Sequence, residues 1–342
     1  MSDVTTALSD ILPILAETFD EPIRSTINRE SPLLNWLPKV PYAGEQVDWR
    51  VSTGGLTVLN PASAAAWGDA SRDTKRKLTL AWGRYAVKIL IGYDALTAAA
   101  RAPSGMFNLL MTEAQEAARQ IAKGLNNDCY DGSGSEKIIG LNTAIDSTGS
   151  YAGLHESDDD AWKSTENGAL STTLSEAILD DHLEDIAALW GSPLTQEDII
   201  VMPFPHRGKL KALLTASSNR THQIITNAGG QSSVTLHGGA SGTIFSDVPV
   251  IADSDCPTDT IFALRRSEIV FKYMPFVVPG TDQPVMVNVK DRNGNVIGQQ
   301  PAMVHVVPLS KTGDHVQLGL IVQGQLQVTH RAAHGKLFAS HD

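Results

Sequence analysis

The chain has 342 residues, of which 42% are hydrophobic, and its 38 acidic and 27 basic residues give a formal net charge of −11. This apolar fraction is enough to form a core, which excludes a disordered chain, and the length allows about two domains. The negative charge excludes general binding to a polyanion, although it allows DNA to be contained without tight attachment.

The N-terminal segment combines an amphipathic helix with a stretch broken by prolines. The apolar positions of the helix share one face and comprise Leu8, Ile11, Leu12, Leu15 and Phe19. The stretch "SPLLNWLPKVPY" (31–42) that follows is apolar but carries three prolines, which oppose a regular element. We therefore predict an extended arm that lies against something else.

A long hairpin is predicted next. Residues 47–51 and 78–82 alternate apolar and polar side chains, as half-buried strands do. The apolar run continues from Tyr85, but its parity changes across Gly83–Arg84, which suggests a β-bulge. Residues 52–77 hold small side chains and the charged stretch "SRDTKRK", so we predict an excursion away from the body. Because an isolated two-stranded hairpin is marginally stable in water, we expect its support to come from outside.

The middle of the chain predicts two long helices. An alanine-rich apolar stripe predicts a helix over 104–130, which would be ~40 Å long. In the second helix, Thr173 and Glu176 form a capping box and Gly191 ends the helix. His182 lies beside the apolar stripe of this helix, so we interpret it as a packing histidine with satisfied hydrogen bonds.

The rest of the chain is rich in predicted strands. "DIIVMPF" reads as a strand followed by a helix from Pro205, and "DVPVIADSDCPTDTIFAL" reads as two short strands around a turn. A hairpin is centred on Asn293–Gly294, and "AMVHVVPL" and "VQLGLIVQGQLQVTH" complete the set. The predicted class is α+β. No apolar run reaches the ~18 residues of a membrane span.

The acidic stretch "LHESDDDAW" (154–162) is a candidate cation or catalytic site. A calcium loop needs alternating ligands and a central glycine, whereas Asp158, Asp159 and Asp160 are contiguous, so their side chains diverge. We interpret the stretch as a solvated loop and predict no metal there. A metal-dependent hydrolase that uses these aspartates with His155 and Glu156 remains the alternative from a different functional class.

No other pattern predicts catalysis or a cofactor. His330 and His334 lack the glutamate that a zinc hydrolase places after its first histidine. The chain has no phosphate-binding loop and no nucleophile elbow. Cys129 and Cys256 form neither a disulfide framework nor a zinc set, which fits a reducing cytosol. The N-terminus also lacks the pattern of a secretory signal.

The order of the elements resembles that of the major capsid proteins of tailed bacteriophages, which have the Hong Kong 97 fold. The stretches that carry the resemblance are the arm ending in "SPLLNWLP", the hairpin excursion, the alanine-rich helix, "GLNTAI…YAGLHESDDDAW", "DIIVMPFPHRGKLKALL", "DVPVIADSDCPTDTIFAL" and "QGQLQVTHRAAHGKL". Each motif is weak alone, but their order is specific and covers nearly the whole chain.

The resemblance implies a division of the chain into four parts. These are an N-terminal arm (1–43), an extended hairpin loop (44–93), a peripheral domain (94–145 and 268–326) with the spine helix 104–130, and an axial domain (146–267 and 327–342).

The resemblance also implies a structural function without catalysis, cofactor, metal or membrane. The protein would assemble with itself, as hexamers and pentamers, into an icosahedral head shell that encloses double-stranded DNA with weak or no specific binding. Portal, scaffold and decoration proteins are further implied partners. The shell would form in the bacterial cytoplasm and become part of the virion. An encapsulin-like nanocompartment shell is the alternative with the same fold.

Two features of some relatives are not expected here. The arm begins close to Met1, so any scaffold is expected to be a separate protein or unnecessary. Lys75 and Lys77 could serve an isopeptide cross-link on the hairpin, but no partner residue can be assigned, so cross-links are not predicted.

The residues predicted to contact neighbouring subunits fall into three groups. Those that dock the arm are Leu12, Leu15, Phe19, Leu33, Leu34 and Trp36. Those that stiffen the hairpin are Trp49, Trp82 and Tyr85. Those that supply charge at its tip are Arg72, Lys75, Arg76 and Lys77. Ordinary packing within the chain is the alternative for each of these residues.

Overall fold

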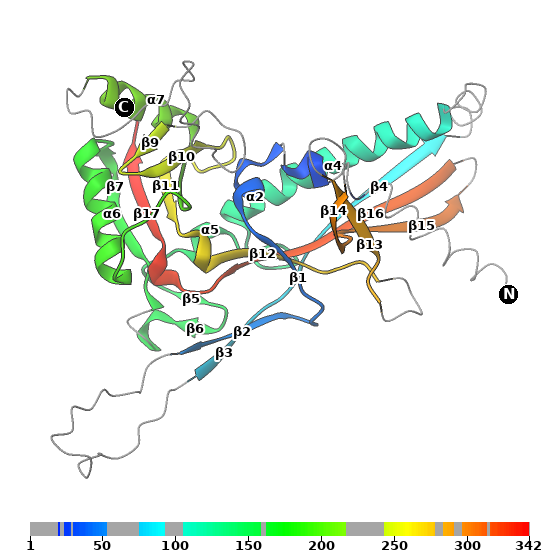
Figure 1. Ribbon diagram of the computed structural model, residues 1–342, viewed down its shortest axis with the longest axis horizontal. Helices are drawn as coiled ribbons and strands as arrows, with labels where there is room; N and C mark the ends of the chain where they lie inside the picture. The colour runs from blue at the N-terminus through cyan, green and yellow to red at the C-terminus, as the bar shows by residue number, and fades with distance from the viewer. Residues whose placement is uncertain are drawn as a thin grey trace, which may run out of the picture.

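The computed structural model describes most of the chain and shows the predicted α+β class. The described residues are 20, 24–28, 30–52, 75–92, 105–158, 162–216, 243–277, 283–290, 296–312 and 315–341. Two main sheets lie next to each other along the long axis of the molecule, and the chain passes between them at residues 265–268 and 329–334 (Figure 1). Leu12, Leu15, Phe19 and Arg72 lie outside the described residues.

The first sheet has five strands and is built around the long strand β16 (His315–Val328). Its other strands are β1 (Lys39–Pro41), β4 (Gly83–Gly92), β12 (Ile269–Tyr273) and β15 (Val304–Thr312). The helix α4 (Gly105–Asp131) runs along β4, which confirms the spine helix predicted from the alanine-rich stripe (Figure 1). Within the described part of the chain, no helix has an apolar stretch that would span a bilayer.

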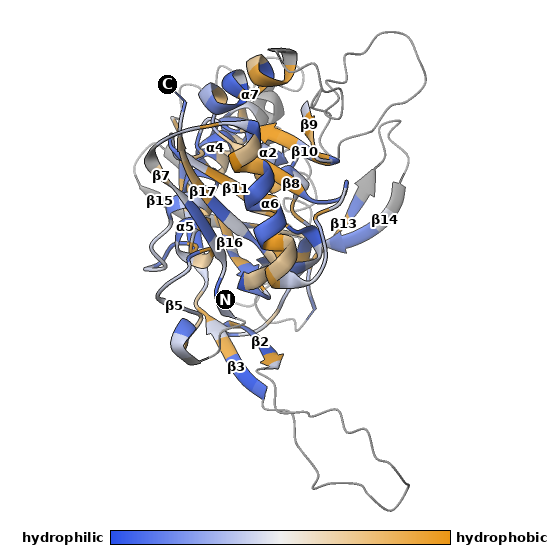
Figure 2. Cartoon of the chain, turned by 90° about the vertical axis from the view of Figure 1, so that its left-hand side faces the viewer, coloured by the Kyte–Doolittle hydropathy of each residue, from blue (hydrophilic) through white to orange (hydrophobic). Residues whose placement is uncertain are grey.

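The second sheet has six strands in the order β7-β17-β11-β8-β10-β9. Their bounds are β7 (Thr165–Thr173), β8 (Ile199–Met202), β9 (Thr243–Phe245), β10 (Val248–Ala252), β11 (Thr260–Leu264) and β17 (Gly335–Ser340). Every residue of β8 and β10 is buried, and both strands are largely orange in Figure 2. The helices α6 (Glu176–Trp190) and α7 (Phe204–Ala216) contribute the leucines that complete this core.

Most of the predicted C-terminal strands are confirmed. The two strands expected in residues 247–264 are β10 and β11, but both pair with β8 and not with each other. The hairpin predicted near Asn293–Gly294 is present as the pair β13 (Met286–Lys290) and β14 (Val296–Pro301), while its turn lies outside the described residues. The smaller elements are α2 (Pro32–Trp36), α5 (Leu141–Ala144), β5 (Ser150–Tyr151) and β6 (Leu154–His155).

The predicted bulge at Gly83–Arg84 is wrong, because the chain changes sheet there. The hairpin pairs β2 (Val47–Ser52) with β3 (Lys75–Leu80), and β4 then pairs with β16 over its whole length. The parity of the apolar residues changes because β3 and β4 belong to different sheets, although the buried side chains of both join the same hydrophobic cluster. Gly83 stands where the chain passes closest to the loop after α4, since a Cβ there would lie 2.6 Å from the backbone nitrogen of Ile138.

The predicted capping box of α6 is also wrong. The N-cap is Ser175, whose hydroxyl accepts a hydrogen bond from the backbone N–H of Ile178 at 3.3 Å. Thr173 is the last residue of β7 and pairs with Ser340 in the sheet, so the helix can begin only after it. The other end is as predicted, because Gly191 has φ of +90° and closes the helix in the left-handed conformation.

His182 is buried, as expected, but it is not satisfied. Its side chain is fully buried against Gly335, and neither ring nitrogen has a hydrogen-bond partner. Burial lowers the pKa of His182 to about 4, because the charged imidazolium would lose its hydration inside the core. The histidine is therefore held neutral at physiological pH.

Gly83→Ala is expected to lower the free energy of unfolding by about 1–3 kcal/mol, because the added methyl group would push against fixed backbone atoms. Gly92→Ala, at the other end of the same strand, is the matched control, since no described atom lies within 4 Å of its Cβ position. Thermal or urea unfolding of both variants measures the difference. Equal stability of the two variants would show that the close approach at Gly83 does not constrain the fold.

The free energy of unfolding is expected to decrease as the pH is lowered, because the buried His182 is harder to protonate in the folded chain than in the unfolded chain. The unfolded chain takes up this proton near the ordinary histidine pKa of about 6.5, whereas the folded chain takes it up only near 4. More protons bind the unfolded state in that window, so the free energy of unfolding decreases as the pH falls through it. Urea unfolding between pH 7 and pH 4 should give a shallower decrease for His182→Gln than for the wild type.

The control is His155→Gln, which removes a histidine from the surface and not from the core. An unchanged slope in His182→Gln would contradict the assignment of acid sensitivity to this buried ring.

Candidate functional site

The base of the β2–β3 hairpin packs onto the body of its own chain. Its inner face consists of side chains that are at most 3% exposed, namely Val47, Val51, Leu78 and Leu80. The backbone N–H of Thr79 also donates to the carbonyl of Ala152 at 3.3 Å. The support that the hairpin was predicted to need comes, at its base, from the body of the same chain, whereas residues 53–74 lie outside the described part.

Tyr151 connects the hairpin base to the central strand of the first sheet. Its ring lies 6.2 Å from the ring of Trp49 in β2 and 6.3 Å from that of Trp162, measured between centroids. Its hydroxyl donates to the carbonyl of Leu326 and accepts from the N–H of Val328, each at 3.1 Å. The fully buried tyrosine thus joins an aromatic contact on the hairpin to two backbone bonds on β16.

The acidic stretch "LHESDDDAW" supports this aromatic contact with its two apolar ends. Leu154 and Trp162 are each 1% exposed, so both ends of the stretch are anchored in the core. Between them, the imidazole of His155 lies 2.8 Å from the carboxylate of Glu156. The side chains of Asp158–Asp160 lie outside the described residues, so the structure does not test the hydrolase alternative.

Polar contacts fix the outer side of the hairpin base. Asp48 accepts a hydrogen bond from the hydroxyl of Tyr42 and lies 2.8 Å from the ammonium of Lys77. The hydrogen bond from Lys77 lowers the pKa of Asp48. The indole N–H of Trp82 donates to the carbonyl of Gly44 at 2.9 Å, which holds the start of the hairpin against its end. Trp82 therefore braces the hairpin from within the same chain.

Tyr85, in contrast, does not stiffen the hairpin. Its hydroxyl donates to the carboxylate of Asp128 at 2.9 Å and accepts from the N–H of Ile138 at 3.2 Å. Asp128 also pairs with the ammonium of Lys137 at 3.1 Å. Burial raises the pKa of Tyr85, so the hydroxyl remains a donor. The prediction was wrong because Tyr85 belongs to β4, which ties the spine helix to the first sheet.

Three of the residues predicted to dock the arm on a neighbour lie in the core of their own chain. Leu33, Leu34 and Trp36 are at most 2% exposed, and all belong to the main hydrophobic cluster. The indole N–H of Trp36 donates to the carbonyl of Glu197 at 3.1 Å. This burial favours the alternative given for each of these residues, ordinary packing within the chain.

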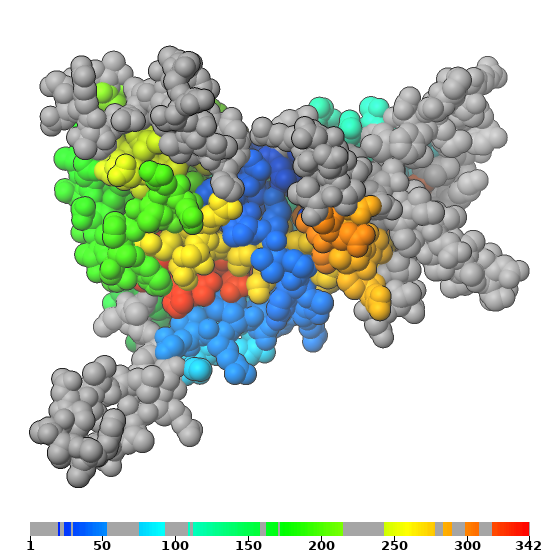
Figure 3. Space-filling model, viewed as in Figure 1, coloured from blue at the N-terminus to red at the C-terminus, as the bar shows by residue number. Residues whose placement is uncertain are grey.

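The described part of the arm crosses one face of the molecule between the two sheets. In Figure 3 it appears as a blue band with the yellow and green segments on one side and the orange segments on the other. Ser31 hydrogen-bonds Asn126 of the spine helix, and Asn126 donates to Asp253 at 2.9 Å and to Asp255 at 2.7 Å. The arm is therefore connected to α4 and, through it, to the end of β10.

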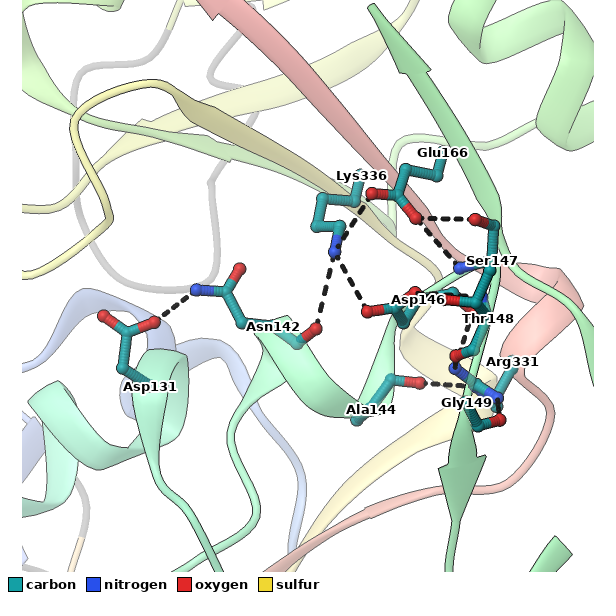
Figure 4. A network of polar contacts seen from close by, with 10 residues as sticks. All are labelled: Asp131, Asn142, Ala144, Asp146, Ser147, Thr148, Gly149, Glu166, Arg331 and Lys336. Carbon is teal, nitrogen blue, oxygen red and sulfur yellow. Dashed lines mark hydrogen bonds and ion pairs between the residues drawn. The ribbon is translucent and has the colours of Figure 1, made fainter. Parts of the chain in front are cut away.

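Arg331 is a buried cation at the junction of the two sheets, in the segment between β16 and β17. Its side chain is fully buried, and burial lowers its pKa, although a guanidinium remains charged at neutral pH. It donates to four backbone carbonyls (Figure 4), those of Ala144 at 2.9 Å, Asp146 at 2.6 Å, Thr148 at 3.2 Å and Gly149 at 3.3 Å. One side chain thus holds the loop that leads from the spine helix to β5.

Lys336 in β17 extends the same network. Its ammonium lies 3.6 Å from the carboxylate of Asp146 and 3.5 Å from that of Glu166, as Figure 4 shows. Glu166 in turn accepts from the backbone N–H of Ser147 at 3.0 Å and from its hydroxyl at 2.7 Å. Sequence reasoning missed both cations. The available signal was a positive charge inside a strand-like stretch.

The two thiols offer no nucleophile. Cys129 and Cys256 are both buried, and burial raises the pKa of each thiol, so the thiolate form is disfavoured at neutral pH. His330 and His334, for which the sequence predicts no zinc pair, have separate partners. His330 pairs with Glu268 at 2.7 Å, while His334 accepts from the N–H of Arg265 at 3.2 Å.

Comparison with solved structures identifies the fold. The capsid asymmetric unit of cyanophage A-1(L) matches with a TM-score of 0.63 at 16% identity, over 92% of this chain and 93% of that chain. The capsid of the native GTA particle matches with a TM-score of 0.57 at 12% identity, over 92% and 90%. The holo-SrpI encapsulin complex of Synechococcus elongatus PCC 7942 matches with a TM-score of 0.50 at 16% identity, over 90% and 87%.

These matches establish that the chain has the Hong Kong 97-type fold of phage capsid proteins, as the order of its sequence motifs predicted. No family model matches the sequence, and no curated protein matches it significantly.

Arg331→Met is expected to lower the free energy of unfolding by at least about 3 kcal/mol, because several buried carbonyls would lose their donor at once. Urea unfolding of the purified protein measures this loss. Arg119→Met is the control on the spine helix, where the side chain is 53% exposed and pairs with Glu116 at the surface. Its effect should stay below about 1 kcal/mol. Similar stability of the two variants would contradict the role of Arg331 at the junction.

Proposed function

We propose that this chain is the major capsid protein of a tailed bacteriophage. Copies of the chain associate as hexamers and pentamers of an icosahedral shell, which encloses double-stranded DNA. The chain acts as structural material and not as an enzyme. The observation that carries the proposal is the likeness in fold to the cyanophage A-1(L) capsid chain, which extends over 92% of this chain and 93% of that chain.

The two sheets fit the division that the proposed function requires. The five-stranded sheet with the spine helix would form the peripheral domain, and the six-stranded sheet with α6 and α7 would form the axial domain. The hairpin and the arm would extend from this body toward adjacent subunits. Portal, scaffold and decoration proteins would be further partners, and the shell would assemble in the host cytoplasm before becoming the virion head.

The outer end of the hairpin base is the part of the described surface that best fits a contact between subunits. Lys75 and Arg76 are both exposed at this end, on a chain whose formal net charge is −11. An exposed basic patch on an acidic protein favours contact with acidic surface on a second copy. The same net charge disfavours tight binding to the enclosed DNA.

An encapsulin-like compartment is the second candidate, because the holo-SrpI encapsulin complex also matches over 90% of this chain. The two functions differ in what the shell contains. Particles isolated from the native host should hold double-stranded DNA under the capsid proposal and an enzyme cargo under the encapsulin proposal.

The full chain expressed alone should form capsomers or hollow particles of uniform size. Size-exclusion chromatography and negative-stain electron microscopy will detect them. A folded chain that remains monomeric at high concentration would contradict the proposed function.

The double variant Lys75→Glu with Arg76→Glu is expected to reduce particle yield strongly, because it reverses the charge of the hairpin contact. Its thermal unfolding midpoint should stay near that of the wild type, since both side chains are exposed. Lys209→Glu with Lys211→Glu on α7 is a control with the same change in charge. Equal particle yields from both double variants would exclude the hairpin patch as a contact.

A further inference from the structure

Three side chains with metal-ligating atoms meet at the far end of the second sheet. His206 lies in the first turn of α7, Asp259 lies in the turn between β10 and β11, and His341 follows β17. One ligand atom from each residue lies within 4.8 Å of the others, and the two imidazole rings meet edge to face at 5.4 Å. Among the described residues, this is the one group of three histidine, cysteine or acidic side chains with such spacing.

The backbone of Ala339 positions the group. Its carbonyl accepts a hydrogen bond from Nε2 of His206 at 2.8 Å, and its N–H donates to the backbone carbonyl of Asp259 at 3.2 Å. His341 follows two residues later in the chain. The three residues are therefore brought together by the ordinary hydrogen bonding of β17, without any need for an ion to assemble them.

The hydrogen bond to Ala339 also determines which nitrogen of His206 could bind a metal. A carbonyl only accepts, so Nε2 carries the proton and the neutral ring keeps its lone pair on Nδ1. The side chain of His206 is fully buried, and its Nδ1 has no hydrogen-bond partner. Metal-binding histidines commonly donate their second nitrogen to a carbonyl in this way. Burial lowers the pKa of His206, which favours the neutral form of the ring.

The three ligand groups suit a divalent cation of intermediate softness. Two imidazole nitrogens and one carboxylate suit Zn²⁺, which takes a fourth ligand from water when the protein provides three. Ligands around a tetrahedral zinc ion lie roughly 3.4 Å apart, so separations of up to 4.8 Å must close by at most about 1.4 Å. Asp259 and His341 are only partly buried, and rotation of their side chains can provide this change.

We infer that His206, Asp259 and His341 form a binding site for one divalent transition-metal ion of the zinc type. The bound ion would fasten the C-terminal strand to α7 and to the β10–β11 turn, and so stabilise one end of the six-stranded sheet. This inference does not depend on the proposed function, because it concerns only contacts within one chain.

Zinc binding to the untagged full-length protein tests the inference, since a histidine tag would itself bind the ion. After dialysis against a chelator, titration calorimetry with ZnCl₂ should give about one ion per chain, and excess Zn²⁺ should raise the unfolding midpoint. Asp259→Asn and His341→Gln should each weaken binding by about tenfold or more and remove most of the thermal shift.

His155→Gln is the control, because it removes an exposed histidine far from the site and should leave both readouts unchanged. The two test positions are partly buried, so these variants should fold, and circular dichroism without zinc verifies this. Wild-type protein that binds no Zn²⁺, or variants that bind it as tightly as the wild type, would overturn the inference.

Discussion

The contact of Tyr151 with β16 is the constraint on which the arrangement of the projecting hairpin depends. The hydroxyl is bonded to two backbone groups of the central strand, while the ring packs against Trp49 of the hairpin and Trp162 of the loop. A two-stranded hairpin alone is marginally stable in water. Since its base is buried on the body, the chain can hold this element in a defined direction before any neighbour is present. In the proposed shell such a fixed direction would favour assembly, because the hairpin would not have to be ordered at that step.

A second constraint acts at the junction of the two sheets. The chain passes between the two sheets more than once. The hydrogen bonds of Arg331 and the ion pairs of Lys336 join the segments at this junction in one buried network. A buried charge without partners would be strongly destabilising, and its hydrogen bonds to several carbonyls are what make it tolerable. Hydrogen bonds depend on direction, whereas apolar contacts do not. The network therefore favours one fixed arrangement of the two sheets relative to each other.

The sequence predicted the elements well and their tertiary partners less well. The spine helix, the α7 unit and the β13–β14 hairpin follow from local periodicity, which depends only on neighbouring residues. The change of parity near Gly83 was visible, but periodicity reports only which side of a strand is buried and not the sheet it joins. The same limit explains the arm, because apolar side chains such as Leu33 reveal burial without revealing whose core buries them. The surroundings of His182 and Arg331 are formed by groups far away in the sequence, and no local pattern predicts these surroundings.

Hydrogen–deuterium exchange on the subunit before and after assembly tests the central claim most directly. Amides of β2 and β3 should exchange slowly in the dilute, dissociated subunit, and assembly should change their rates little, because their own chain already buries them. Fast exchange of both strands in the free subunit, with protection gained only on assembly, would contradict the account.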